Sequence, residues 1–130
     1  MKFSSVQGGT RVQATIYGME KGLHGFHVHQ WGNLEEGCKT AGGHFNPFGK
    51  THGGPDKEER HVGDMGNIES DGKIANLDYV DKMIELSGDN SIIGRAVVVH
   101  SGVDDLGEGG FDDSKTTGHA GGRLGCGVIG

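Results

Sequence analysis

The stretch Leu-His-Gly-Phe-His-Val-His, residues 23–29, alternates in character from one position to the next. Successive side chains of a strand point to opposite faces, so Phe26 and Val28 share one face and His27 and His29 share the other. The stretch therefore predicts a β-strand with an apolar face and a face that carries two neighbouring imidazoles. Taken alone, this pair is as consistent with ordinary exposed alternation as with a chelating site.

The other apolar stretches are equally short, and together they predict an all-β chain. Thr10–Tyr17 alternates in the same way, whereas Ile92–His100 and Leu124–Ile129 have the character of buried strands. Glycine, Asn, Asp and Ser separate these stretches, and no segment holds the helical apolar period over three turns, so we expect almost no helix. Asp71-Gly72 suits a tight hairpin turn. Further short strands are expected at Met1–Val6, Asn67–Glu69, Lys73–Asp78 and Met83–Leu86.

Composition and charge limit the class of protein. The 130 residues predict one domain, residues 1–130, and the 27 glycines leave little material for a core, so we expect covalent or metal cross-links. The formal net charge of −6 argues against nucleic acid as a partner. No apolar run approaches the roughly 20 residues of a membrane span. No signal peptide is visible, so we expect a cytoplasmic protein that does not bind membranes.

Two long segments, Gln30–Met65 and Ser101–Arg123, fit no regular element and are rich in Gly, His and Asp. Long loops without periodicity are usually functional or disordered. A mobile surface loop is the simpler interpretation, but the residues that could bind metals favour two functional loops.

Several histidines outside residues 23–29 strengthen the case for a metal site. His44 and His52 lie in glycine-rich stretches of the first long segment, and His61 precedes Asp64 by three residues. His100 closes the most apolar strand. Imidazole is a preferred ligand of copper and zinc, and a buried histidine without a partner is costly.

These motifs, taken together, closely resemble those of the copper/zinc superoxide dismutases, in the same order along nearly the whole chain. The matching segments are Gly-Phe-His-Val-His (25–29), Ala-Gly-Gly-His-Phe-Asn-Pro (41–47), His-Gly-Gly-Pro (52–55), Arg-His-Val-Gly-Asp-Met-Gly-Asn (60–67), Ile-Ile-Gly-Arg-Ala-Val-Val-Val-His (92–100), Asp-Asp-Leu-Gly (104–107) and Gly-Gly-Arg-Leu-Gly-Cys-Gly-Val-Ile-Gly (121–130). The resemblance implies a Greek-key β-barrel, a member of the immunoglobulin-like sandwich architectures, with two long functional loops.

The resemblance also implies two metal sites that share one imidazole. The implied copper ligands are His27, His29, His44 and His100. The implied zinc ligands are His44, His52, His61 and Asp64. Four nitrogens suit Cu(II), and three nitrogens with one carboxylate suit a closed tetrahedral zinc site.

Further roles follow from the same resemblance. Asp104 is expected to orient His27 and His52, one ligand of each metal. We expect a structural hydrogen bond for His24. His119 stands where the family usually has Asn, and no role is assigned to it.

The resemblance pairs Cys38 with Cys126 in a disulfide, although two reduced thiols are the ordinary expectation for a cytosolic protein. Arg123 matches the family's active-site arginine rather than an ordinary surface charge, and Thr117 matches the residue that narrows the channel to the copper. Arg123 and the bridging His44 are the expected catalytic residues.

The function implied is a superoxide dismutase, which converts superoxide to dioxygen and hydrogen peroxide while copper is alternately reduced and oxidised. Expected partners are superoxide, a second copy of the chain and a copper chaperone. Two alternatives remain from the sequence: a copper-delivery domain for such an enzyme, and a catalytically idle zinc-binding structural barrel. The full copper set and the retained Arg123 favour the enzyme.

The chain also lacks the family's usual first β-strand, which lies between the second strand and the last. We therefore expect Met1–Val6 and Leu124–Gly130 to form open sheet edges, and the homodimer to be weakened or rearranged.

Overall fold

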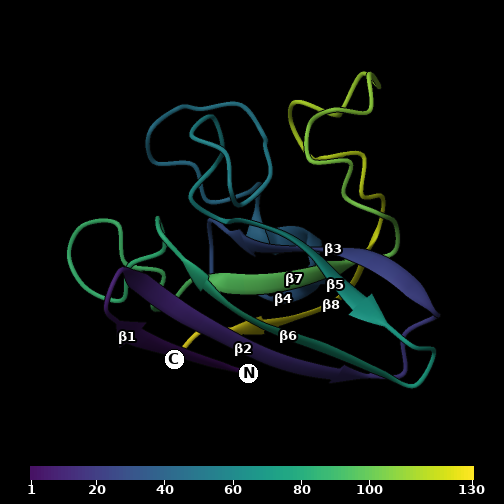
Figure 1. Cartoon of the computed structure of the whole chain (residues 1–130), viewed down its shortest axis with the longest axis horizontal. Coiled ribbons are helices and arrows are strands. Elements are labelled where there is room, and N and C mark those ends of the chain that lie inside the picture. The colour runs from purple at the N-terminus through teal and green to yellow at the C-terminus, as the bar shows by residue number, and fades with distance from the viewer.

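The computed structural model describes residues 1–130, which form eight strands, seven of them in one curled antiparallel sheet, and a single short 3-10 helix (Figure 1). The elements are β1 (Lys2–Val6), β2 (Gly9–Tyr17), β3 (Gly22–His29), β4 (Glu35–Cys38), η1 (Lys39–Ala41), β5 (Asp64–Ser70), β6 (Ile74–Asp81), β7 (Ala96–His100) and β8 (Arg123–Val128). Seven strands form the sheet, in the order β1-β2-β6-β5-β3-β7-β8. The prediction of an all-β fold with almost no helix is confirmed.

The strand order separates strands that follow one another in the chain. β2 and β3 are consecutive, yet β6 and β5 lie between them, and β3 pairs with β5 on one side and β7 on the other. Such returns of the chain to an earlier strand are characteristic of Greek-key connections. The sheet curls around its own apolar face and forms an incomplete barrel.

The core lies inside this curl, and it confirms the alternation of residues 23–29. Phe26 and Val28 belong to a cluster of 14 buried apolar residues that also takes in Val12, Ile68 and Ile92. His27 and His29 leave the opposite face of β3, where they are 0% and 1% exposed because the loops cover them. Ordinary exposed alternation is thus ruled out for this pair.

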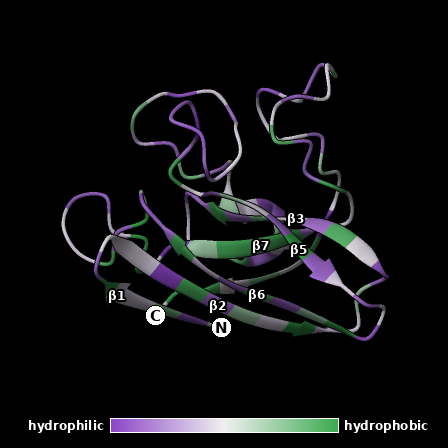
Figure 2. Cartoon of the chain, viewed as in Figure 1, coloured by the Kyte–Doolittle hydropathy of each residue, from purple (hydrophilic) through white to green (hydrophobic).

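The two long loops, residues 42–63 and 101–122, rise from the same side of the sheet over the end where β3 and β7 lie (Figure 1). Figure 2 shows that both loops have many hydrophilic residues, in contrast to the more hydrophobic β7 beneath them. The two predicted functional segments are therefore brought together in space, although about 40 residues of chain separate them.

The structure corrects three predictions of local structure. Met83–Leu86 is not a strand, because the Asp81 carboxylate accepts the backbone N–H groups of Met83 and Ile84 and turns the chain. The strand expected at Ile92–His100 begins only at Ala96, after a turn with Gly94 at φ +86°. β4 and η1 lie within a segment for which no element was predicted.

The turn at Asp71-Gly72 is confirmed: it joins β5 to β6, and the Asp71 side chain accepts the backbone N–H groups of Lys73 and Ile74. β1 and β8 end the strand order, so each has one edge without a partner strand. This confirms the expected open edges.

Candidate metal centre

Four imidazoles converge where β3, β7 and the first long loop meet. His27 and His29 come from β3, and His100 ends the neighbouring β7. His44 is brought in by a short bridge between its backbone and that of His29. One ring nitrogen from each of the four lies within 4.8 Å of the others, and Nε2 of His29 lies 3.4 Å from Nε2 of His100.

A second cluster surrounds one oxygen of Asp64. Its Oδ1 lies 2.9 Å from Nδ1 of His44, 3.0 Å from Nδ1 of His52 and 3.2 Å from Nδ1 of His61. The other oxygen, Oδ2, accepts the backbone N–H groups of His61 and Gly53, at 2.9 and 3.1 Å. The backbone thus fixes the carboxylate so that one oxygen faces three imidazoles.

His44 belongs to both clusters. Its Nδ1 faces Asp64, whereas its Nε2 is buried and has no hydrogen-bond partner. Nδ1 of His27 is also buried without a partner, and Nδ1 of His52 is buried without a hydrogen bond of good geometry, although Oδ1 of Asp64 lies 3.0 Å away. Unsatisfied buried polar atoms are rare because each costs free energy, and three of them pointing into two adjoining clusters indicate missing ligands. The donor sets, four imidazoles and three imidazoles with a carboxylate, fit copper and zinc.

Asp104, in the second long loop, joins the two clusters from behind. Its Oδ2 accepts a hydrogen bond from Nε2 of His27 at 2.7 Å, and its Oδ1 accepts one from Nε2 of His52, also at 2.7 Å. These bonds leave Nδ1 of each ring free to face its cluster. The structure therefore brings Asp104 to the two histidines that the sequence analysis named.

Burial controls the protonation of these rings when no metal is present. It lowers the pKa of His27 to about 3, of His29 to about 2 and of His100 to about 4, so these imidazoles are neutral. Burial acts the same way on His52, but its hydrogen bond to Asp104 and the nearby Asp64 carboxylate outweigh it and raise the pKa to about 9.

The carboxylates of Asp64 and Asp104 are ionised because, as at His52, hydrogen bonds outweigh the effect of burial. Burial opposes their charge, but hydrogen bonds from the surrounding imidazoles hold the pKa of Asp64 far below its ordinary value and lower that of Asp104 to about 2. Neutral imidazoles and ionised carboxylates are the states in which these groups bind metals, so His52, which its raised pKa keeps protonated at neutral pH, must release a proton when a metal binds.

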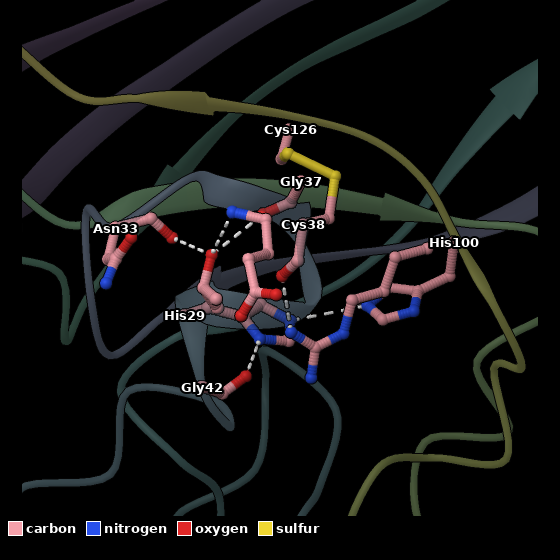
Figure 3. Close-up of a disulfide and its surroundings, with 10 residues drawn as sticks. His29, Asn33, Gly37, Cys38, Gly42, His100 and Cys126 are labelled. Atoms are coloured by element: carbon pink, nitrogen blue, oxygen red, sulfur yellow. Dashed lines mark hydrogen bonds between the residues drawn. A yellow bond between two sulfur atoms is a disulfide. The ribbon is translucent and has the colours of Figure 1, made fainter.

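The disulfide Cys38–Cys126 ties β4 to β8 next to the four-imidazole cluster, as Figure 3 shows beside His29 and His100. The predicted pairing is confirmed. The backbone carbonyl of Cys38 accepts a hydrogen bond from Nη1 of Arg123 at 2.8 Å. The disulfide thus places the acceptor that orients the guanidinium, and the charge of Arg123 contributes, after burial, to the lowered pKa of His29 and His100.

The remaining predicted residues lie at the periphery. Thr117 is exposed in the second loop, and its backbone N–H and hydroxyl both donate to the Asp113 carbonyl. His24 is bonded to the backbone carbonyls of Glu20 and His100, which confirms the structural hydrogen bond expected for it.

Sequence reasoning missed two residues that hold the loops. Asn67 exchanges two hydrogen bonds with the backbone of Asp104: Nδ2 donates to its carbonyl, and Oδ1 accepts its N–H. Arg60 is 1% exposed and donates to three backbone carbonyls of its own loop. Both lie in the quoted motif of residues 60–67, and an arginine directly before a ligand-type histidine was the available signal.

An incomplete antiparallel barrel with two adjoining nitrogen-rich clusters, linked by one imidazole and one carboxylate, defines a dinuclear metalloprotein. Comparisons with known proteins identify the family. A family model described as copper/zinc superoxide dismutase matches residues 1–129. The chain belongs to this family.

Two relatives illustrate the similarity. A copper-zinc superoxide dismutase of Candida albicans is 61% identical over 109 residues, which make up 83% of this chain and 71% of that protein. A crystal structure of the clock protein EA4 superposes with a TM-score of 0.95 at 50% identity, over 98% of this chain and 83% of that one.

Membership of the family makes the protein an oxidoreductase that uses copper and zinc and acts on superoxide. Two groups of side chains are close enough together to hold a metal ion: His27, His29, His44 and His100, and His27, His44, His52 and Asp64. His61 lies beside the second group, with its Nδ1 3.2 Å from Oδ1 of Asp64. The relatives therefore favour the enzyme over the copper-delivery domain and the idle barrel. No helix here is long and apolar enough to cross a membrane.

Proposed function

We propose that His27, His29, His44 and His100 bind the copper and that His44, His52, His61 and Asp64 bind the zinc. The observation that carries this assignment is the position of His44, with Nδ1 beside Asp64 and Nε2 buried without a partner among the other imidazoles. A single ring in this position can serve both metals. Asp104 orients His27 and His52 through its two oxygens.

Copper, when bound, would supply the one-electron chemistry in which one superoxide is oxidised to dioxygen and a second superoxide, with two protons, is reduced to hydrogen peroxide. Arg123 contributes a positive charge that attracts the anion, and the Cys38 carbonyl fixes its direction. This local charge is needed because the chain as a whole carries −6. Thr117 limits the width of the approach.

Reduction of superoxide to peroxide consumes two protons. We assign to Nε2 of His44 the task of holding one of them at the stage when this atom would not be bound to copper, because no other group of the chain hydrogen-bonds to it. Its other nitrogen, Nδ1, would stay on the zinc side beside Asp64, and this keeps the ring oriented.

The assignment is tested by metal analysis of the wild-type protein and of His44→Ala. We expect one copper and one zinc per wild-type chain, an activity with superoxide, and a copper spectrum that responds to the metal in the zinc site. In His44→Ala this response should disappear even if both metals bind. A wild-type protein that fills with zinc and rejects copper would contradict the proposal.

We further propose that two copies associate through the face that carries Ile93 and Val128. Both are about half exposed, and they border a groove of about 430 Å³ between the free edges of β1 and β8, which Phe3, Val97 and Ile129 also line. The open edges weaken or rearrange this homodimer. Light scattering with Ile93→Glu tests it: we expect a dimer that this variant dissociates, and a strictly monomeric wild type would exclude it.

Three further proposals complete the description. Residues 1–130 form a single domain, supported by one continuous sheet and tested by a single cooperative unfolding transition. The protein acts as an antioxidant in the cytoplasm, which cell fractionation tests. A copper chaperone delivers the metal, and comparing copper content with and without such a protein tests this.

A further inference from the structure

The second long loop carries a contact that the metal ligands do not use. His119 donates a hydrogen bond from Nδ1 to Oδ1 of Asp113 at 2.6 Å, and its ring stacks on Phe111 with centroids 3.8 Å apart and planes 8° from parallel. The side chains of His119 and Asp113 are each about half exposed. We call these three residues, Phe111, Asp113 and His119, the loop clasp.

The backbone of His119 is held in an unusual conformation. Its φ is +55°, in the left-handed region that side chains with a Cβ seldom adopt, and the neighbouring Gly118 has φ +73°. Such a conformation persists only where surrounding contacts enforce it. The hydrogen bond and the stacked ring of the loop clasp are the contacts that the His119 side chain makes, beside the backbone hydrogen bonds of Gly118 and Ala120.

The inner side of the same turn lies against the metal centre. Gly118 and Ala120 are buried on either side of the exposed His119. A Cβ at Gly118 would collide with Oδ1 of Asp104 and with Nε2 of His52, the two atoms of one hydrogen bond. The Gly118 carbonyl also accepts the backbone N–H of Asp105 at 2.9 Å. Gly118 therefore covers the contact between Asp104 and His52.

We propose that His119 is a positioning residue for the reaction: by closing the loop clasp on the outside, it holds Gly118 over the Asp104–His52 contact and so keeps the zinc ligand His52 in place. The inference rests on the ligand assignment proposed above. When the clasp opens, the turn of residues 113–119 lifts, water reaches Asp104, and His52 loses its fixed orientation.

Hydrogen exchange of the metal-loaded protein measures the loop directly. The backbone N–H groups of Thr116, Thr117 and Gly118 all donate to the Asp113 carbonyl, so they report whether the turn is closed. In His119→Ala we expect these amides to exchange about tenfold faster, as the loss of one charge-assisted hydrogen bond predicts. Zinc should pass to a chromophoric chelator several-fold faster.

Two further variants separate the contacts from backbone strain. His119→Gly removes the side chain but adopts the left-handed conformation freely, and it should behave like His119→Ala. His119→Asn also tolerates this conformation and retains a donor for Asp113, and it should rescue part of the protection. If His119→Gly is as protected as the wild type, the side-chain contacts do no positioning and the proposal is wrong.

Two neighbouring aspartates provide a control for the effect of removing a negative charge. Asp113→Asn and Asp112→Asn each remove one negative charge from the same loop, but only Asp113 contacts His119. We expect faster amide exchange and faster zinc loss in Asp113→Asn but not in Asp112→Asn. The double variant Asp113→Asn/His119→Ala should exchange and lose zinc no faster than either of its single variants. Equal effects of the two Asp→Asn variants would show that charge, not position, matters and would overturn the inference.

The outcome is distinguishable from a failure of the proposed function. If the wild-type protein fails to bind one copper and one zinc, the ligand assignment is wrong. If the wild type binds both and His119→Ala retains zinc and loop protection unchanged, only the role of His119 is rejected.

Discussion

The guanidinium of Arg60 and the carboxylate of Asp81 meet in the interior, with Nη1 3.0 Å from Oδ2 and both side chains fully buried. Arg60 belongs to the first long loop, whereas Asp81 is the last residue of β6. The same guanidinium donates to the backbone carbonyls of Pro55, His61 and Val62. One arginine therefore joins the first long loop to the barrel.

Asp81→Asn should destabilise the protein strongly, because it leaves the buried charge of Arg60 without its partner. Breaking a buried ion pair in this way costs about 3–5 kcal/mol. Asp78→Asn is the matched control, since Asp78 also pairs with an arginine, Arg11, but at the exposed surface. Urea unfolding should show a large loss for Asp81→Asn and little change for Asp78→Asn. Equal losses would mean that burial of the pair is unimportant.

Arg123→Ala should slow the consumption of superoxide by about tenfold or more at low ionic strength, since a focused positive charge raises the rate of anion encounter. The copper and zinc contents should not change, because the guanidinium binds no metal. Stopped-flow rates over a range of salt concentrations check this, and the deficit should shrink as salt screens the charge. Arg123→Lys keeps the positive charge but lacks the planar guanidinium. Its rate of superoxide consumption should lie between the rates of the wild type and Arg123→Ala. An Arg123→Ala variant as fast as the wild type in dilute buffer would remove Arg123 from the mechanism.

Reduction of Cys38–Cys126 should lower the melting temperature. The bridge spans 88 residues, for which loop-closure entropy gives at most about 4.6 kcal/mol of stabilisation. Loss of the bridge also frees the Cys38 carbonyl that Arg123 uses, so activity should fall more than metal content. Scanning calorimetry of the paired variant Cys38→Ser/Cys126→Ser, beside the reduced wild type, measures the stability. Two alkylatable thiols in the native protein would refute the bridge itself.

The metal-free protein should lose stability in acid. His27, His29 and His100 have pKa values of about 3, 2 and 4 when folded, below the ordinary 6.5 of an unfolded chain. Below pH 6.5 the unfolded state therefore binds protons that the folded state does not, and each such group removes up to about 1.4 kcal/mol per pH unit.

His52 acts in the opposite sense. Its pKa is raised to about 9, so its contribution is complete below pH 6.5 and is lost as the pH rises through 9. Urea unfolding of chelator-treated protein between pH 4.5 and 9.5 should show a maximum near neutrality with a steeper acid side, because three groups act there against one. A stability that is flat from pH 6.5 to 4.5 would contradict the neutral state of the three buried rings.

Local pattern carried most of the prediction of the fold. Period-2 alternation in residues 10–17 and 23–29 is a property of neighbouring residues, and both stretches form strands in the structure. Met83–Leu86 failed for a local reason as well: the preceding Asp81 caps two backbone N–H groups, and this overrides the apolar character of the segment. β4 lacks an apolar pattern and lies outside the seven-stranded order, so nothing in the sequence Glu-Glu-Gly-Cys indicated it.

The candidate site was predicted through motifs, and its supporting contacts were not. Alternation alone placed His27 and His29 on one face of a strand, and the resemblance to a family supplied the ligand set and Asp64. Arg60–Asp81 and Asn67–Asp104 depend instead on which distant segments the fold brings together. The loop clasp is similar: neither Phe111 nor His119 is informative until the turn between them is known.

Asp104 accepts hydrogen bonds from one imidazole of each cluster, so we expect the two proposed metal sites to be thermodynamically linked. A carboxylate that moves toward His27 moves relative to His52, so occupancy of one site changes the free energy of binding at the other. Linkage is reciprocal: the factor by which zinc changes the affinity for copper equals the factor by which copper changes the affinity for zinc. Because both sites share this side chain, the two metals should bind as a coupled pair and not independently.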